Sequence, residues 1–143
     1  MNKFLLSTAI VLIAVLSISC NGEQKKKITP EQSAEFTVYF QIKDALVGDD
    51  LDQVKSAVAE NNLQDAIRTE NIDVAREDFF VWTQALEKVL EENAYGEVVY
   101  KQQCPMAFDN FGAYWFSLEE KVYNPYFGAQ MLRCGSVQAT YEK

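Results

Sequence analysis

Between residues 29 and 96, apolar residues recur every three or four positions, which is the period of an amphipathic helix. Three stretches carry this pattern: Phe36–Val47, Leu51–Ile67 and Ile72–Leu90. The second stretch is interrupted at Asn61 and Asn62, so we expect a break there. Because the connections between the stretches are short, the pattern predicts three antiparallel helices packed around a common core.

Capping residues mark where these helices begin and end. The first helix is predicted to begin at Thr29, because Pro30 suits the first helical position and Gln32 completes a capping box with Thr29. Gly48 is typical of a helix end. The other predicted boundaries are Asp49 or Asp50 and Asn71 as starts, and residues 93–96 as the last end.

After Gly96 the pattern changes. Val98–Tyr100 favours a short strand, but the following residues mix aromatic side chains with Gly, Asn and Pro turns. We therefore expect residues 98–137 to form an ordered, mostly irregular C-terminal cap against the helices, with one helical turn near Phe127–Leu132. The predicted fold class is mainly α: an antiparallel three-helix bundle, or a four-helix bundle as the alternative, with an aromatic-rich Cys/Met cap and little β structure.

The N-terminus is typical of a targeting signal. Lys3 precedes an apolar run, Phe4–Ile18, whose 15 residues are short for a membrane span and suit a signal peptide. Ser19 and Cys20 follow directly, as in a bacterial lipoprotein processing site, although Ser17 stands where Leu is usual. Lipidation of Cys20 is the prediction, and simple secretion with cleavage elsewhere is the alternative.

These features predict the domain organisation and location of the chain. Residues 1–19 are a signal peptide, residues 20–28 a lipid-anchored tether, and residues 29–143 a single helical domain. The lipid would hold the protein on a membrane of the bacterial cell envelope, facing the periplasm, with the outer membrane favoured over the inner one. The sequence does not indicate an oligomeric state.

Charge and composition exclude several functions. The chain has a formal net charge of −8 and becomes more acidic when Lys3 leaves with the signal peptide, so nucleic acid is not an expected partner. It contains no histidine, which excludes Ser-His-Asp and Cys-His catalysis and His-ligated zinc. No pair of carboxylates or phosphate-binding loop stands out either, and the protein is predicted not to be an enzyme.

Four sulfur-bearing residues are the candidate site. Cys104 lies two positions from Met106, and Met131 lies three positions from Cys134, so each pair can share one face of a strand or a helical turn. Thiolate and thioether ligands together select monovalent copper. We therefore predict a site for Cu(I), with Ag(I) as a second candidate. Zinc is a weaker one, because a carboxylate such as Asp109 would have to complete its ligands.

A structural disulfide between Cys104 and Cys134 is the main alternative. These are the two cysteines that remain once Cys20 is lipidated, and the envelope is oxidising. The protein would then be an interaction module without a metal. The two hypotheses are compatible, because oxidation of the pair could switch a metal site off.

The two cysteine-containing blocks, CPMAFDNFGAYWFS (104–117) and NPYFGAQMLRCG (124–135), resemble a bacterial envelope family of unknown function. Its members occur as small lipoproteins and as extra domains on the periplasmic adaptor subunits of heavy-metal efflux pumps. Residues 39–51 and 74–86 also fit the helical part of that family, so the resemblance covers residues 36–137. It implies an envelope location and an association with copper or silver, with efflux components as partners, and it brings no established activity.

Overall fold

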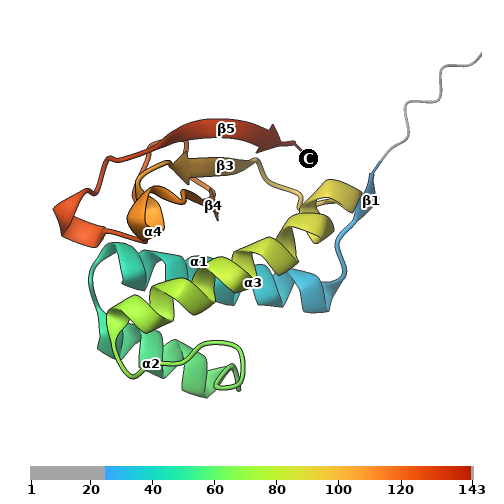
Figure 1. The fold of residues 1–143 in the computed structure, drawn as a ribbon. Helices are drawn as coiled ribbons and strands as arrows, with labels where there is room; N and C mark the ends of the chain where they lie inside the picture. Colours follow the sequence, from blue (N-terminus) through green and yellow to red (C-terminus); the bar gives the residue numbers. More distant parts are fainter. Residues whose placement is uncertain (1–24, 143) are drawn as a thin grey trace, which may run out of the picture.

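The computed structural model describes residues 25–142, which form a layer of helices covered on one side by a small β-sheet (Figure 1). The helical layer contains α1 (Pro30–Val47), α2 (Leu51–Glu60) and α3 (Ile72–Glu92). The sheet contains β3 (Val99–Cys104), β4 (Ala113–Ser117) and β5 (Ser136–Tyr141), in the antiparallel order β4-β3-β5. Four short elements complete the chain: β1 (Lys26–Lys27), β2 (Asn93–Ala94), α4 (Ala107–Asn110) and the 3-10 turn η1 (Gly128–Gln130).

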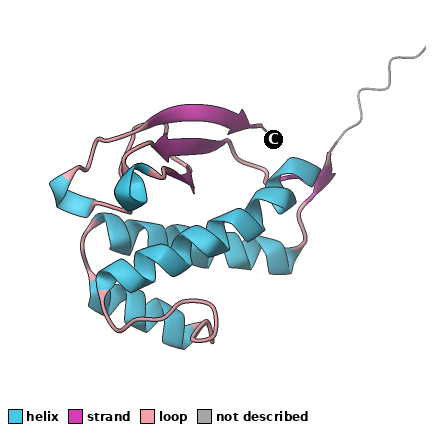
Figure 2. Ribbon diagram, in the orientation of Figure 1, coloured by secondary structure: helices cyan, strands magenta, loops and turns pink. Residues whose placement is uncertain are grey.

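The prediction of a mainly α bundle with little β structure is wrong. The described residues contain five strands beside four helices, and the protein is a mixed α/β domain (Figure 2). The C-terminal cap predicted to be irregular contains β3, β4 and the start of β5. The prediction failed because neither β4 nor β5 has one buried and one exposed face. Four of the five residues of β4 are buried, whereas β5 is exposed along nearly its whole length. Neither strand therefore shows the alternation of apolar and polar residues that predicts a half-buried strand.

The predicted helix starts are confirmed. Thr29 and Gln32 form the capping box of α1, the Asp50 side chain accepts a hydrogen bond from the Gln53 backbone, and Asn71 caps α3. The prediction that the second helix reaches Ile67 is wrong, because α2 ends at Glu60. The Asn61 side chain donates to the Ala57 carbonyl, and Asn62 adopts φ +55, which breaks the helical path.

The described N-terminal residues are attached to the domain. β1 pairs in parallel with β2, and the Ile28 N–H donates to the Ala94 carbonyl at 3.1 Å. The last part of the tether predicted over residues 20–28 is thus hydrogen-bonded to the segment after α3. The signal peptide, Cys20 and the rest of the tether lie outside the described residues. Within residues 25–142, no helix combines the length and apolar character needed to cross a bilayer.

Helices and sheet share one hydrophobic core. Tyr39 of α1 is fully buried and stacks on Phe79 of α3 with ring centroids 4.7 Å apart. Its hydroxyl hydrogen-bonds the Thr83 hydroxyl at 2.9 Å and accepts from the Phe116 backbone N–H at 3.0 Å. Tyr39 therefore satisfies a backbone donor of β4, an edge strand of the sheet, and fixes the position of that strand on the helices.

Glu87 of α3 connects the helical layer to all three strands of the sheet. Its carboxylate accepts hydrogen bonds from Lys101 of β3, from the Tyr114 hydroxyl of β4 at 2.7 Å and from the Tyr141 hydroxyl of β5 at 3.4 Å. Burial would raise the pKa of Glu87, but the hydrogen bonds from Lys101 and Tyr114, the charge of Lys101 and the bond from Tyr141 together lower it. The folded state therefore favours the ionised carboxylate.

Glu87→Gln is expected to lower the free energy of unfolding at pH 7 by about 1–3 kcal/mol, because hydrogen bonds to a charged acceptor are lost. A carboxylate whose pKa is lowered on folding contributes stability above its unfolded pKa of about 4.3 and loses it as the pH falls through the folded pKa. The variant should thus lose less stability than the parent between about pH 5 and pH 3. Urea unfolding across this range measures both effects. Glu91→Gln, an exposed carboxylate one turn further along the same helix, is the control, and parallel pH curves for parent and Glu87→Gln would contradict the assignment.

Candidate functional site

Cys104 and Cys134 lie side by side at one end of the sheet. Cys104 is the last residue of β3 and is fully buried, and Cys134 lies in the turn before β5. Their Sγ atoms are 2.6 Å apart although the residues are 30 positions apart in the chain. The pairing of Gln103 with Ser136 brings the two segments together. Gly135 follows Cys134 and adopts φ +137, and a side chain there would clash with the Gln103 carbonyl.

Cys104 and Cys134 are free thiols whose sulfur atoms are in direct contact, an arrangement called the closed pair below. Two metal–sulfur bonds of about 2.3 Å at a tetrahedral angle separate the sulfurs by about 3.7 Å. A metal ion held by both sulfurs would therefore require the observed 2.6 Å separation to increase by about 1 Å. Hydrogen bonding to Cys104 and then burial raise the pKa of the Cys134 thiol, against a smaller lowering by the backbone N–H of Met106. The folded chain thus holds Cys134 in its protonated form near neutral pH.

Met106 and Met131 line one cavity beside the cysteine pair. Met106 is 47% exposed, Met131 is half-buried, and the cavity has a volume of about 560 Å³. Cys104 and Cys134 are not part of its lining. The Cys134 N–H donates to the Met131 carbonyl at 2.9 Å, so a single turn links the cavity to the pair. The structure therefore brings the cysteines together and the methionines together, in two adjoining places.

Carboxylates do not complete a metal site with the cysteines. Among residues 25–142, no three His, Cys, Asp or Glu side chains gather in a way that could hold a metal ion. Asp109, which the sequence offered as a zinc ligand, lies on the methionine cavity instead. Methionine sulfur is therefore the further ligand that these residues offer to a metal ion at the cysteine pair.

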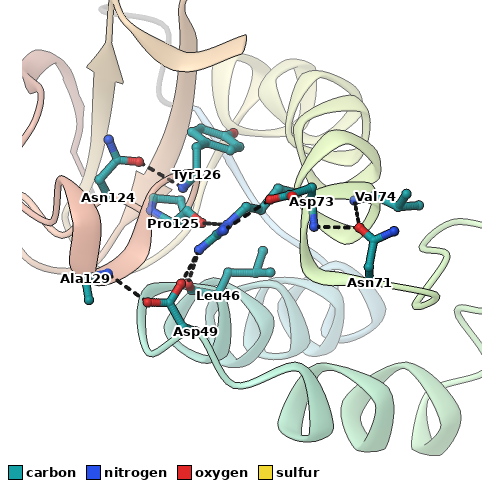
Figure 3. Close-up of polar contacts among 10 residues, drawn as sticks. Leu46, Asp49, Asn71, Asp73, Val74, Asn124, Pro125, Tyr126 and Ala129 are labelled. Carbon is teal, nitrogen blue, oxygen red and sulfur yellow. Dashed lines mark hydrogen bonds and ion pairs between the residues drawn. The ribbon is translucent and has the colours of Figure 1, made fainter. Parts of the chain in front are cut away.

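An ion pair between buried Arg76 and the partly exposed Asp49 carboxylate holds the segment before Cys134 on the helices (Figure 3). Arg76 of α3 donates to the Pro125 carbonyl at 2.8 Å, to the Leu46 carbonyl at 3.3 Å and to the Asp49 carboxylate at 2.5 Å. The other oxygen of Asp49 accepts from the Ala129 N–H at 2.9 Å. Burial would raise the pKa of Asp49, but the Ala129 N–H and the Arg76 guanidinium outweigh it and lower the pKa. Asp49 therefore stays ionised and connects the end of α1 to the turn at η1.

Asn124 then positions Cys134. Its side chain donates to the Cys134 carbonyl at 2.9 Å and accepts from the Tyr126 N–H at 2.8 Å. Tyr126 is buried, and its hydroxyl donates to the Tyr114 carbonyl at 2.6 Å. The Asn124-Pro125-Tyr126 segment thus has a structural role as a turn with an anchored aromatic residue. The sequence offered Asp49 only as a possible helix start and did not point to Arg76 as a functional or structural residue. The sequence signal that could have indicated Arg76 is its position, since a charged residue there lies directly beside the buried apolar positions of α3.

The described residues define a small α/β domain in which a three-stranded sheet ends at a cysteine pair and adjoins a methionine-lined cavity. Comparison with protein-family models, curated proteins and solved structures finds no match for this chain.

Proposed function

We propose that this protein is a lipid-anchored lipoprotein of the bacterial envelope that binds a soft monovalent metal ion, Cu(I) or Ag(I). The ligands are the sulfur atoms of Cys104, Met106, Met131 and Cys134. The supporting observation is that Cys104 and Cys134, 30 positions apart in the chain, have adjacent sulfur atoms, with both methionines on the adjoining cavity. The metal would be buffered or passed to a heavy-metal efflux or resistance system.

Binding begins from the reduced, closed pair. The two sulfurs separate by about 1 Å, the thiols lose their protons, and a thioether from the cavity completes the ligand set. Because thiolates are the ligands and the pKa of Cys134 is raised, metal binding releases protons and the affinity rises with pH. Transfer to a partner proceeds by exchange of sulfur ligands, and no bond of an organic substrate is formed or broken. Oxidation of the pair to a disulfide blocks the site.

A second candidate function is an interaction module without a metal, cross-linked by a Cys104–Cys134 disulfide. The closed spacing of the two sulfurs favours it, since this separation is shorter than a metal bridge requires. In this case the methionines serve only as part of the cavity wall.

The test is an anaerobic Cu(I) titration, in competition with a chromophoric Cu(I) chelator, of the reduced mature chain carrying Cys20→Ser. Cys104→Ser is expected to weaken binding by at least about 100-fold, since even outer-shell partners of a metal contribute about 10- to 100-fold. Met131→Leu keeps the volume of the side chain and is expected to weaken binding by about 10-fold. Asp52→Asn on α2, 93% exposed and away from the site, is the matched control.

Unchanged binding in Cys104→Ser and Met131→Leu would contradict the metal proposal. Thiol counting on protein purified from the envelope then examines the second candidate, which requires both thiols to be blocked before reduction and free after it.

A further inference from the structure

The methionine-lined cavity has the composition of a site for an organic cation. Its lining residues belong to α3 and to the segments around α4 and η1. These elements lie together at one end of the molecule (Figure 1). Its apolar wall consists of thioether and aromatic side chains: Met106, Phe108, Tyr126, Phe127 and Met131. Except for Tyr126, these side chains are only partly buried or exposed. A ligand that covers them would remove apolar surface from water.

The polar part of the cavity is acidic. Asp73, Glu77 and Asp109 line it, and Arg76 is the one basic residue among the lining residues. The Arg76 side chain is 7% exposed and already pairs with Asp49 at 2.5 Å, and more loosely with Asp73 at 3.5 Å. Its charge is thus balanced within the protein. Glu77 and Asp109 belong to no ion pair found among the described residues, so the cavity favours a positive ligand and disfavours an anion.

Aromatic rings and carboxylates together recognise ammonium and guanidinium groups. The rings of Phe108 and Tyr126 lie 5.2 Å apart in a tilted arrangement, and Phe80 packs against both, so this wall is fixed in place. A cation near these ring faces gains electrostatic attraction, and a carboxylate adds a charge-assisted hydrogen bond. The methionine thioethers suit the methylene groups that carry such a cation in a lysine or arginine side chain.

The exposed surface beside the cavity fits a protein partner. Phe111, directly after α4, is 80% exposed, and Met106 before α4 is 47% exposed. Phe111 follows the lining residue Asn110 in the chain, and Met106 itself lines the cavity. Large exposed apolar side chains near an acidic cavity are typical of an interaction site. From this combination we infer that the cavity binds the side chain of a lysine or arginine presented by a partner protein, with the partner's backbone passing over Phe111 and Met106.

Met106 and Met131 belong to both proposals, but the inference does not require metal binding, because the carboxylates that select a cation are not among the proposed metal ligands. The test uses n-butylguanidinium and n-butylammonium as probes, with n-butylurea as the uncharged analogue of similar shape. The mature chain contains methionine only at positions 106 and 131, so methyl-labelled methionine gives two NMR signals that both report on the cavity. Both signals are expected to shift saturably with the two cations, to shift much less with n-butylurea, and to respond less as salt is added.

Glu77→Gln and Asp109→Asn are each expected to weaken n-butylguanidinium binding by about 2- to 5-fold, as for partly exposed ion pairs. Asparagine tolerates the left-handed backbone at position 109, where φ is +54, so the second variant keeps the local fold. Asp52→Asn is again the control. Equal binding of n-butylurea and n-butylguanidinium, or no shift with any probe, would overturn the inference. The Cu(I) affinity of Glu77→Gln and Asp109→Asn should equal that of the parent, which separates this result from the fate of the metal proposal.

Discussion

Replacing Gly128 with alanine is expected to lower the free energy of unfolding by about 3 kcal/mol, the largest effect of any single substitution considered for this chain. Gly128 adopts φ +52, where a side chain costs about 1–2 kcal/mol. A Cβ atom there would also overlap the Asp49 carboxylate, which Arg76 and Ala129 hold in place. Moving the carboxylate away would leave Arg76 buried without its main partner, at a further cost of about 1–3 kcal/mol.

Gly48→Ala is the matched control for this prediction. Gly48 has φ −80, and an added Cβ would meet only ordinary contacts at 3.5 Å and beyond, so alanine should change the stability by less than about 1 kcal/mol. In an Asp49→Gly background the overlap disappears. Gly128→Ala should then lower the free energy of unfolding only by the cost of a side chain at positive φ, about 1–2 kcal/mol. Urea unfolding of the parent, Gly128→Ala, Asp49→Gly and the double variant measures the coupling, and Gly48→Ala is measured beside them. Equal effects of Gly48→Ala and Gly128→Ala would refute the proposed contact.

The helical half of the fold could be predicted because its signals are local. Thr29, Asp50 and Asn71 each satisfy backbone N–H groups within three residues of themselves, so the sequence alone carries the information. The end of α2 was less predictable. Ile67 keeps the apolar spacing of a helix and is buried, but it reaches the core from a turn after the chain has left the helix.

The sheet could not be predicted because its strands take their burial from tertiary contacts. β4 packs against the helices and pairs with β3 along one edge. The residues of β5 are mostly exposed and contribute little to the core. A pattern rule that expects one buried and one exposed face therefore misses both strands. Only β3, which begins with the β-branched Val99, could be predicted from its own residues.

The candidate site was also predicted only in part from the sequence. The sulfur-bearing residues led to the prediction that Cys104 and Cys134 lie together, and the antiparallel pairing of β3 with β5 supplies the long-range contact that their spacing could not. The link through Arg76 and Asp49 joins three segments that are far apart in the chain. Its one local signal is the charge of Arg76 beside buried positions of α3, and only the folded structure shows which segments the link joins.

Oxidation of Cys104 and Cys134 is expected to raise the free energy of unfolding by about 3–4 kcal/mol, because closing a loop of about 30 residues restricts the unfolded chain. With oxidised glutathione as the oxidant, the two protein thiols give up two electrons and two protons and form one disulfide, and two molecules of reduced glutathione leave. The adjacent sulfurs allow this bond to form without a rearrangement of the sheet. Guanidinium unfolding of the mature chain carrying Cys20→Ser, before and after oxidation, measures the difference.

The control is the double variant Cys104→Ser, Cys134→Ser, whose stability should not respond to glutathione. Oxidised parent protein should also fail to bind Cu(I), whereas the reduced parent should bind it, because a disulfide sulfur is no longer a thiolate ligand. If oxidation leaves the stability unchanged while it abolishes metal binding, the loop between the cysteines is already restricted in the unfolded chain and the pair acts only at the metal site. If oxidation raises the stability and the reduced chain binds no Cu(I), the pair is a structural cross-link and the second candidate function holds.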